Sequence, residues 1–268
     1  MDTQQHDIQA DIVAEDLWRT IFFEAEQAVK VEPLLASFIH LTVLRHQSLD
    51  DVLAFHLSSK LASQVMDARA LQELFKEALK EDPQISHAMH ADIIACYDRD
   101  PACDYYSLPL LYFKGFHAIQ SQRVTHWLWH KGHDSLAYFL QNRISEVMGV
   151  DIHPAAKLGK GIMIDHGTGV VVGETAVIGD NVSMLHGVTL GGSGKASGDR
   201  HPKIKEGVLI GANASILGNI TVGECAKVGA GSVVLEDVPA YSTVVGVPAR
   251  VVANSPKQTP ALDMNQNI

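Results

Sequence analysis

The chain has 268 residues, of which 46% are hydrophobic, which is enough for one large domain or two ordinary ones with a buried core. Its formal net charge of −10, with only 21 Lys and Arg residues, argues against a nucleic-acid-binding protein, because neutralising phosphates requires a basic face. No apolar run reaches the roughly 18 residues of a membrane-spanning helix, and the polar N-terminal segment is unlike a signal peptide. We therefore expect a cytoplasmic globular protein that binds neither nucleic acid nor membranes.

Residues 1–148 carry the pattern of an all-helical domain. Asp82 followed by Pro83 is typical of a helix start, with an N-cap and a first-turn proline. The three cysteines show no CxxC spacing, so we expect reduced, structural thiols. Apolar side chains recur at intervals of three and four residues, as at Leu71, Leu74, Phe75 and Ala78. The pattern predicts several helices of about 10 to 20 residues.

After Gly149 the apolar period changes to six residues. A first series contains Ile152, Leu158, Ile164, Val170, Ala176, Val182 and Val188, and a second contains Ile204, Ile210, Ile216, Val222, Val228 and Val234. A six-residue unit cannot bury its own apolar side chain, so successive coils must stack at the strand spacing of ~4.8 Å. The pattern predicts a parallel β-helix over residues 149–250, with coils of about 18 residues. The fold class is therefore α+β.

The repeat is broken between Val188 and Ile204 by a spacing that is not a multiple of six. The intervening residues are polar and rich in glycine, which predicts a loop ejected from the coil over residues 189–203. The periodicity ends near residue 250, and we expect residues 251–268 to form a flexible tail.

Asp151 and His166 are the first candidates for chemistry. They lie 15 residues apart, close to one 18-residue coil, so we expect them to meet on neighbouring coils. A carboxylate that orients an imidazole gives a general base able to deprotonate an alcohol. The alternative is a structural hydrogen bond at a corner of the coil.

The predicted loop is the second candidate. Glycines allow close backbone approach and lysines supply positive charge, so cofactor phosphates could bind at Gly191, Gly192, Gly194, Lys195, Lys203 and Lys205. Arg200 and His201 offer a fork for a carboxylate and a second imidazole. A simple turn and a solvent-exposed loop are the alternatives.

Histidines in or beside the first coils raise the question of zinc. The spacings do not form a clear stacked trio, so we expect no metal site at His153, His166, His186 and His201.

Taken together, these segments resemble the serine acetyltransferase family, over nearly the whole chain. The similarity lies in Asp100-Pro-Ala, Pro109-Leu-Leu-Tyr-Phe-Lys-Gly-Phe-His117, Asp151-Ile-His-Pro-Ala-Ala, Asp165-His166, Val172-Gly-Glu-Thr-Ala176, Gly191-Gly192 and Gly198-Asp-Arg-His-Pro-Lys203. The resemblance implies a left-handed β-helix and transfer of an acetyl group from acetyl-CoA to L-serine. The products would be O-acetyl-L-serine and CoA, in the first step of cysteine biosynthesis.

The resemblance also implies roles for individual residues. His166 would be the general base and Asp151 its orienting partner. The serine ammonium would lie at Asp100 and Asp165, and its carboxylate at Arg200 and His201. Acetyl-CoA, a cosubstrate rather than a tightly bound cofactor, would contact Gly192, Ser193, Ala212 and Lys227.

The family further implies regulation and assembly. L-cysteine would compete for the serine site. β-Helices would form trimers, and helical domains would join two trimers into a hexamer, with active sites between neighbouring subunits. The C-terminal Ile268 would bind O-acetylserine sulfhydrylase.

Three other functions remain open from the residues. A hexapeptide acyltransferase acting on a sugar would share the coil, a zinc hydratase of the β-helix type would need a histidine cluster, and a non-catalytic module would use its tail for docking.

Overall fold

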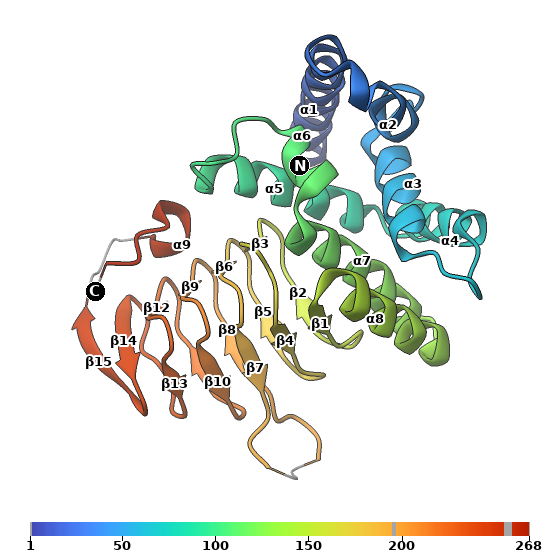
Figure 1. Cartoon of the computed structure of the whole chain (residues 1–268). Coiled ribbons are helices and arrows are strands. Elements are labelled where there is room, and N and C mark those ends of the chain that lie inside the picture. Colours follow the sequence, from blue (N-terminus) through green and yellow to red (C-terminus); the bar gives the residue numbers. More distant parts are fainter. Residues whose placement is uncertain (1, 195–196, 255–258, 268) are drawn as a thin grey trace.

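The computed structural model describes residues 2–194, 197–254 and 259–267, with side chains from residue 15 onward. Lys195 and Ile268 lie outside the described residues. A helical domain packs against one end of a parallel β-helix, with α7 and α8 beside the first coil (Figure 1). The predicted α+β class and its order along the chain are confirmed.

The helical domain contains eight α-helices and two short irregular helices among the described residues. They are α1 Asp2–Val31, η1 Pro33–Leu35, α2 Ala36–Ile39, η2 His40–Leu44, α3 Leu49–Leu61, α4 Ala68–Glu81, α5 Pro83–Arg99, α6 Ser107–Tyr112, α7 Lys114–His130 and α8 Asp134–Met148. In α4 the predicted stripe buries Leu71, Phe75 and Ala78. The Asp82 side chain accepts from Gln84 N at 3.1 Å, which confirms the predicted start of α5.

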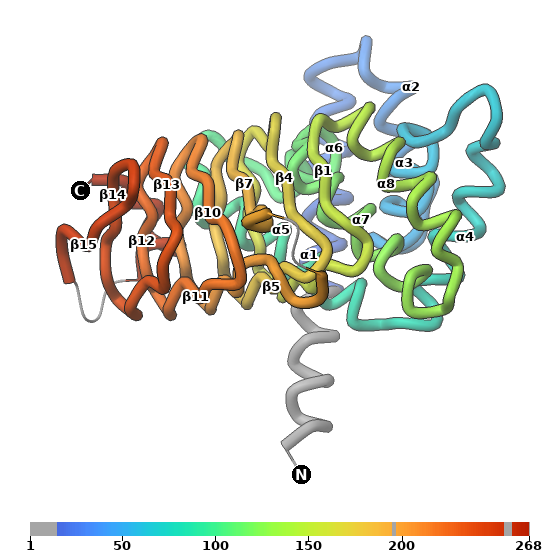
Figure 2. Tube along the Cα trace, turned by 90° about the horizontal axis from the view of Figure 1, so that it is seen from below, coloured from blue at the N-terminus to red at the C-terminus, as the bar shows by residue number. Residues whose placement is uncertain are grey.

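Three sheets form the faces of the β-helix. Sheet one contains β1 Val150–Ile152, β4 Val170–Val172, β7 Thr189–Gly191, β10 Ser215–Leu217 and β13 Val233–Val234. Sheet two contains β2 Lys157–Leu158, β5 Val177–Ile178, β8 Lys203–Ile204 and β11 Thr221–Val222. Sheet three contains β3 Met163–Ile164, β6 Ser183–Met184, β9 Leu209–Ile210, β12 Lys227–Val228, β14 Ser242–Gly246 and β15 Ala249–Asn254. Figure 2 shows strands of sheet one side by side along the solenoid.

The stacking register corrects the predicted coil length. Asp151 pairs with Val171, which is 20 residues on, whereas Val171 pairs with Thr189 after 18. The two extra residues lie between β3 and β4, because Met163 and Val171 are eight residues apart instead of six. Apolar columns consequently change phase there: Ile152 stacks on Val172, not in line with Val170. Residues of the predicted series beyond this point are still buried, because they fill a second inward position, at Val170, Ala176, Val182 and Val188.

The predicted loop exists but is shorter than expected. β7 continues to Gly191 and β8 begins at Lys203, so only residues 192–202 leave the coil, as the excursion below β7 in Figure 1. Thr189 pairs with Ser215, which makes this coil 26 residues long, eight more than the regular 18.

The C-terminal segment departs from the predicted flexible tail. β15 pairs antiparallel with β14, and α9, Pro260–Asp263, folds back on sheet three. Ala261 of α9 is fully buried against Leu185 and Leu209. Apolar side chains on the outer face of sheet three therefore give this segment a surface to pack on.

A buried ion pair joins the two domains. Arg123 of α7 donates to Asp92 of α5 at 2.7 Å and to the carbonyl of Gly159 at 2.8 Å. Asp92 also accepts from Ile162 N, just before β3, at 2.7 Å. Burial raises the pKa of Asp92, and the Arg123 guanidinium opposes that rise. The pair thereby fixes the end of α5 against the first coil.

Within the described chain, none of the helices is long and apolar enough to cross a membrane. The three cysteines are free thiols.

Candidate active site

The extra-long turn between β3 and β4, residues 165–169, is here called the His166 corner. His166 has a φ of 57°, in the left-handed region, and Gly167 and Gly169 follow with 73° and 78°. A non-glycine residue rarely adopts this conformation, and such residues cluster at functional sites. The His166 side chain is 74% exposed, and its Nε2 lies 3.7 Å from Asp165 Oδ2.

The helical domain holds the His166 corner by close backbone contact. A Cβ added to Gly115, in the first turn of α7, would lie 2.1 Å from the carbonyl oxygen of Ile164. A Cβ at Gly167 would lie 3.2 Å from Gly115 Cα. Only glycine at residue 115 therefore lets α7 press on the strand that leads into the corner.

Asp100 comes from the helical domain into the same place. A cavity of about 400 Å³ beside α7 is lined by Asp100, Asp165 and His166. A second cavity of about 720 Å³ shares Asp100 and Asp165 and extends to Leu262, Asp263, Met264 and Gln266 of the C-terminal segment. Three of the predicted site residues are thus brought together around one cleft.

Arg99 fixes Asp100 at the end of α5. Its guanidinium, almost completely buried, donates to Gly161 O at 3.0 Å, Ser183 Oγ at 3.1 Å and Asn181 Oδ1 at 3.2 Å. Asp100 then caps the helix and accepts from Ala102 N at 2.9 Å. The carboxylate is therefore held by two successive coils of the β-helix.

Asp151 does not meet His166 within one chain. Asp151 Oδ1 accepts from Gln141 Nε2 at 2.7 Å, whereas His166 contacts Asp165. The prediction assumed an 18-residue coil, and the two extra residues move His166 out of that register. The pair predicted from spacing is not formed in the single chain.

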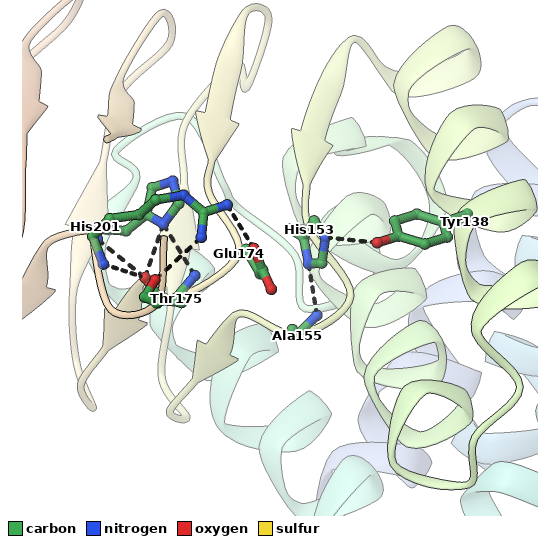
Figure 3. A network of polar contacts seen from close by, with 8 residues as sticks. Tyr138, His153, Ala155, Glu174, Thr175 and His201 are labelled. Carbon is green, nitrogen blue, oxygen red and sulfur yellow. Dashed lines mark hydrogen bonds and ion pairs between the residues drawn. The ribbon is translucent and has the colours of Figure 1, made fainter. Parts of the chain in front are cut away.

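Arg200 and His201 lie at a different edge, where sheet one turns into sheet two, here called the His201 corner (Figure 3). Thr175 Oγ1 accepts from the backbone N–H groups of Arg200 and His201 at 3.0 and 3.1 Å. Thr175 N donates to His201 Nδ1 at 3.1 Å, so a neutral His201 carries its proton on Nε2. Burial lowers the pKa of His201, which favours this neutral form.

Two further contacts complete the His201 corner. Arg200 pairs with Glu174 Oε2 at 2.6 Å, and the Glu174 pKa is lowered by that hydrogen bond. A Cβ at Gly173 would lie 2.1 Å from His201 Nε2, so the ring lies directly over this glycine.

His153 lies near the same corner, on the preceding coil. Its Nδ1 accepts from Ala155 N at 3.0 Å and its Nε2 is 3.4 Å from the Tyr138 hydroxyl (Figure 3). Burial lowers the pKa of His153, and Glu174 opposes this.

Sequence reasoning assigned no role to Thr175 or Glu174. Each contacts residues 25 or 26 positions away, across the loop, and no fixed spacing signals such a contact.

The predicted acetyl-CoA contacts fall into two groups. Gly192 and Ser193 follow β7 at the base of the loop, on the His201 side of sheet one. Ala212 follows β9 and lies in line with the His166 corner. Lys227 is almost buried, and its ammonium donates to the carbonyls of Asn265, at 3.2 Å, and Asn267. The C-terminal segment therefore covers part of this second group.

Among the described side chains, no group of three His, Cys, Asp or Glu residues is placed to hold a metal ion.

A β-helix of six-residue repeats with an imidazole exposed at one corner defines a hexapeptide-repeat transferase. Residues 201–236 match the profile described as bacterial transferase hexapeptide (six repeats), and residues 17–121 match that of the serine acetyltransferase N-terminal region. The serine acetyltransferase of Salmonella typhimurium is 56% identical over 253 residues, which cover 94% of this chain and 93% of that protein. The chain belongs to the serine acetyltransferase family and is an acyltransferase.

Solved structures agree with this assignment. Neisseria gonorrhoeae serine acetyltransferase in complex with serine is 66% identical, with a TM-score of 0.85, covering 87% of this chain and 96% of that one. A serine acetyltransferase in complex with cysteine is 56% identical, with a TM-score of 0.94, covering 95% and 99%. The Brucella abortus enzyme in complex with coenzyme A is 52% identical, with a TM-score of 0.88, covering 90% and 96%.

Proposed function

We propose that the protein transfers the acetyl group of acetyl-CoA to the hydroxyl of L-serine, giving O-acetyl-L-serine and CoA. The observation that carries this proposal is the cleft in which Asp100 and Asp165 stand beside the exposed His166. Two carboxylates suit an ammonium group, and the imidazole suits a hydroxyl. Relatives in complex with serine and with coenzyme A support the two substrates.

The reaction needs one proton carrier. His166 takes the proton of the serine hydroxyl as its oxygen forms a bond to the thioester carbonyl carbon. The carbonyl electrons move to oxygen and give a tetrahedral oxyanion. When the carbon–sulfur bond breaks, the CoA thiolate leaves with the electron pair and takes the proton back from His166.

The serine carboxylate binds a second copy of the chain. Arg200 and His201 lie across sheet one from His166, so one copy does not bring all four serine ligands together. We assign the carboxylate to these residues of a neighbouring subunit, and Asp151 to the His166 of a neighbour. A trimer of β-helices would meet this requirement.

A hexamer would use the helical domain. Large apolar side chains are exposed on α1, the η1 region and the α6 segment, among them Phe23, Leu34, Tyr105 and Tyr112. Phe23, Tyr105 and Tyr112 line a cavity of about 340 Å³. Contact with a second trimer would cover them.

L-Cysteine is proposed as a competitive inhibitor, because it differs from serine by one sulfur atom. A relative in complex with cysteine supports this role. The product would enter cysteine biosynthesis, and O-acetylserine sulfhydrylase would bind the terminal Ile268.

Thiol release from acetyl-CoA in the presence of L-serine tests the function. His166→Ala should lower kcat by about 10²- to 10⁴-fold, the usual contribution of a general base. His133→Ala, at an exposed histidine at the start of α8, is the matched control and should keep the wild-type rate. Unchanged turnover in His166→Ala would refute the assignment. A panel that replaces serine by amino sugars separates this function from that of a sugar acyltransferase.

A further inference from the structure

A second histidine lies beside His166 and has no role in the steps described above. His186 is the second residue after β6, as His166 is after β3 and Ala212 is after β9. These strands are neighbours in sheet three, with Ile164 on Met184 and Met184 on Ile210. His186 therefore stands between the proposed general base and a proposed contact of acetyl-CoA.

The two imidazoles are close. Their ring centroids are 6.0 Å apart and the rings are inclined at 61°. His166 is exposed and must reach the serine hydroxyl, so a donor on His186 is within reach of the same reacting group. Ala212, the next residue along this edge, has no side-chain donor.

The hydrogen bonding of His186 shows which nitrogen is free to act. Nδ1 is buried and has no hydrogen-bond partner among the described residues, whereas nearly all buried polar atoms in proteins have one. Burying an N–H without an acceptor is rarer than burying an unpaired acceptor. The neutral ring therefore keeps its proton on Nε2, at the opposite side of the ring.

We propose that His186 is a catalytic residue whose Nε2–H donates a hydrogen bond to the thioester carbonyl oxygen of acetyl-CoA. The negative charge that develops on this oxygen, as the serine oxygen bonds to carbon, strengthens the bond in the transition state. When the intermediate collapses, the carbonyl re-forms, the CoA thiolate leaves and His186 keeps its proton. This inference rests on the proposed function and supplies the oxyanion donor that the reaction requires.

Three substitutions separate donation from packing. In His186→Gln the side-chain amide nitrogen can occupy the region of Nε2 and can still donate. In His186→Asn the shorter amide reaches only the region of Nδ1. His186→Met fills a similar volume without a donor.

The test measures kcat and KM for both substrates by thiol release, with thermal unfolding of each variant to confirm the fold. Loss of one oxyanion donor should lower kcat of the Met and Asn variants on the order of 100-fold. KM for serine should stay within about threefold, and the Gln variant should keep a kcat at least about tenfold above that of the Met variant.

The opposite results overturn the proposal. A kcat in His186→Met or His186→Asn within about tenfold of wild type would show that no donor is lost. A Gln variant as slow as the Met variant, or an effect confined to KM, would also contradict it. If one variant fails to fold, the comparison of the remaining variants decides. Absence of thiol release by the unmodified protein would instead refute the proposed function, and this inference with it.

Discussion

Replacing Arg123 by methionine removes one partner of the buried ion pair that joins the helical domain to the β-helix. Asp92, which is fully buried, then keeps only two neutral donors, Gln120 Nε2 at 2.8 Å and Ile162 N at 2.7 Å. Breaking a buried pair on one side costs about 3–5 kcal/mol, and the remaining donors favour the lower end. We therefore expect a loss of about 3 kcal/mol, or roughly 6–12 °C in the midpoint of thermal unfolding.

Calorimetry or circular dichroism at several pH values measures this loss. Burial raises the pKa of Asp92, and without the guanidinium the carboxyl takes up a proton more readily. A carboxyl whose folded pKa is raised destabilises the fold more as the pH increases, so the loss should be larger at pH 8 than at pH 5. Replacing both residues, as Asp92→Leu with Arg123→Met, should recover a substantial part.

An exposed pair provides the control. Glu81→Gln, which breaks the ion pair with Lys131, should leave the unfolding midpoint unchanged. A midpoint for Arg123→Met within about 2 °C of wild type would refute the reasoning, because it would mean that the pair adds nothing to the joint between the domains.

Three further predictions concern the helical core, the His201 corner and the contact between α7 and β3. Burial lowers the pKa of His56 to about 4 and that of His117 to about 3, so both stay neutral while the unfolded chain takes up protons. Stability should be full above pH 6.5 and fall by ~2.7 kcal/mol per pH unit near pH 5, and a flat profile in urea titrations would contradict the burial of both rings. Thr175→Val removes the oxygen that accepts from the Arg200 and His201 backbone, and should raise KM for serine by about tenfold with a smaller effect on kcat; steady-state kinetics would show the reverse if the hydroxyl served only stability. Gly115→Ala places a methyl group 2.1 Å from the Ile164 carbonyl and should lower both kcat and the unfolding midpoint, whereas Gly132→Ala, which meets no atom within 4 Å, is the control for the loss of a glycine. The positive φ of Gly132, 79°, adds strain to that control, so a drop in Gly115→Ala no larger than in Gly132→Ala would contradict the contact.

The fold could be predicted from the sequence because its two periods are simple. Amphipathic spacing marked the helix over α4, and the six-residue repeat marked the solenoid. The register could not be predicted, because each turn of the coil points two residues inward and both are apolar. Val170 and Val172 are both buried, so the sequence did not reveal the two residues inserted at the His166 corner.

The site was predicted only in part, for physical reasons. His166 and Asp165 are adjacent in sequence, but Asp100 reaches them through the end of α5, which Arg99 anchors by contacts that no spacing encodes. The spacing argument for Asp151 and His166 did not hold within one chain, because it used a regular coil at the one turn that is irregular. The family resemblance, confirmed by the comparisons, supplied the candidates that spacing could not.

The order of the C-terminal segment also escaped prediction. Ala261 and Met264 pack beside Ala212 and the outer face of sheet three, although no period runs through this segment. A few apolar side chains with a complementary surface are sufficient for such packing, and that surface exists only in the folded β-helix.

The most direct test of the central claim is identification of the product formed from acetyl-CoA and an equimolar mixture of L-serine and an amino sugar. Mass spectrometry should detect O-acetyl-L-serine in an amount equal to the thiol released, with none formed by His166→Ala above the uncatalysed rate. Acetylation of the sugar alone, or thiol release without any acetylserine, would contradict the assignment of the cleft at Asp100, Asp165 and His166 to serine.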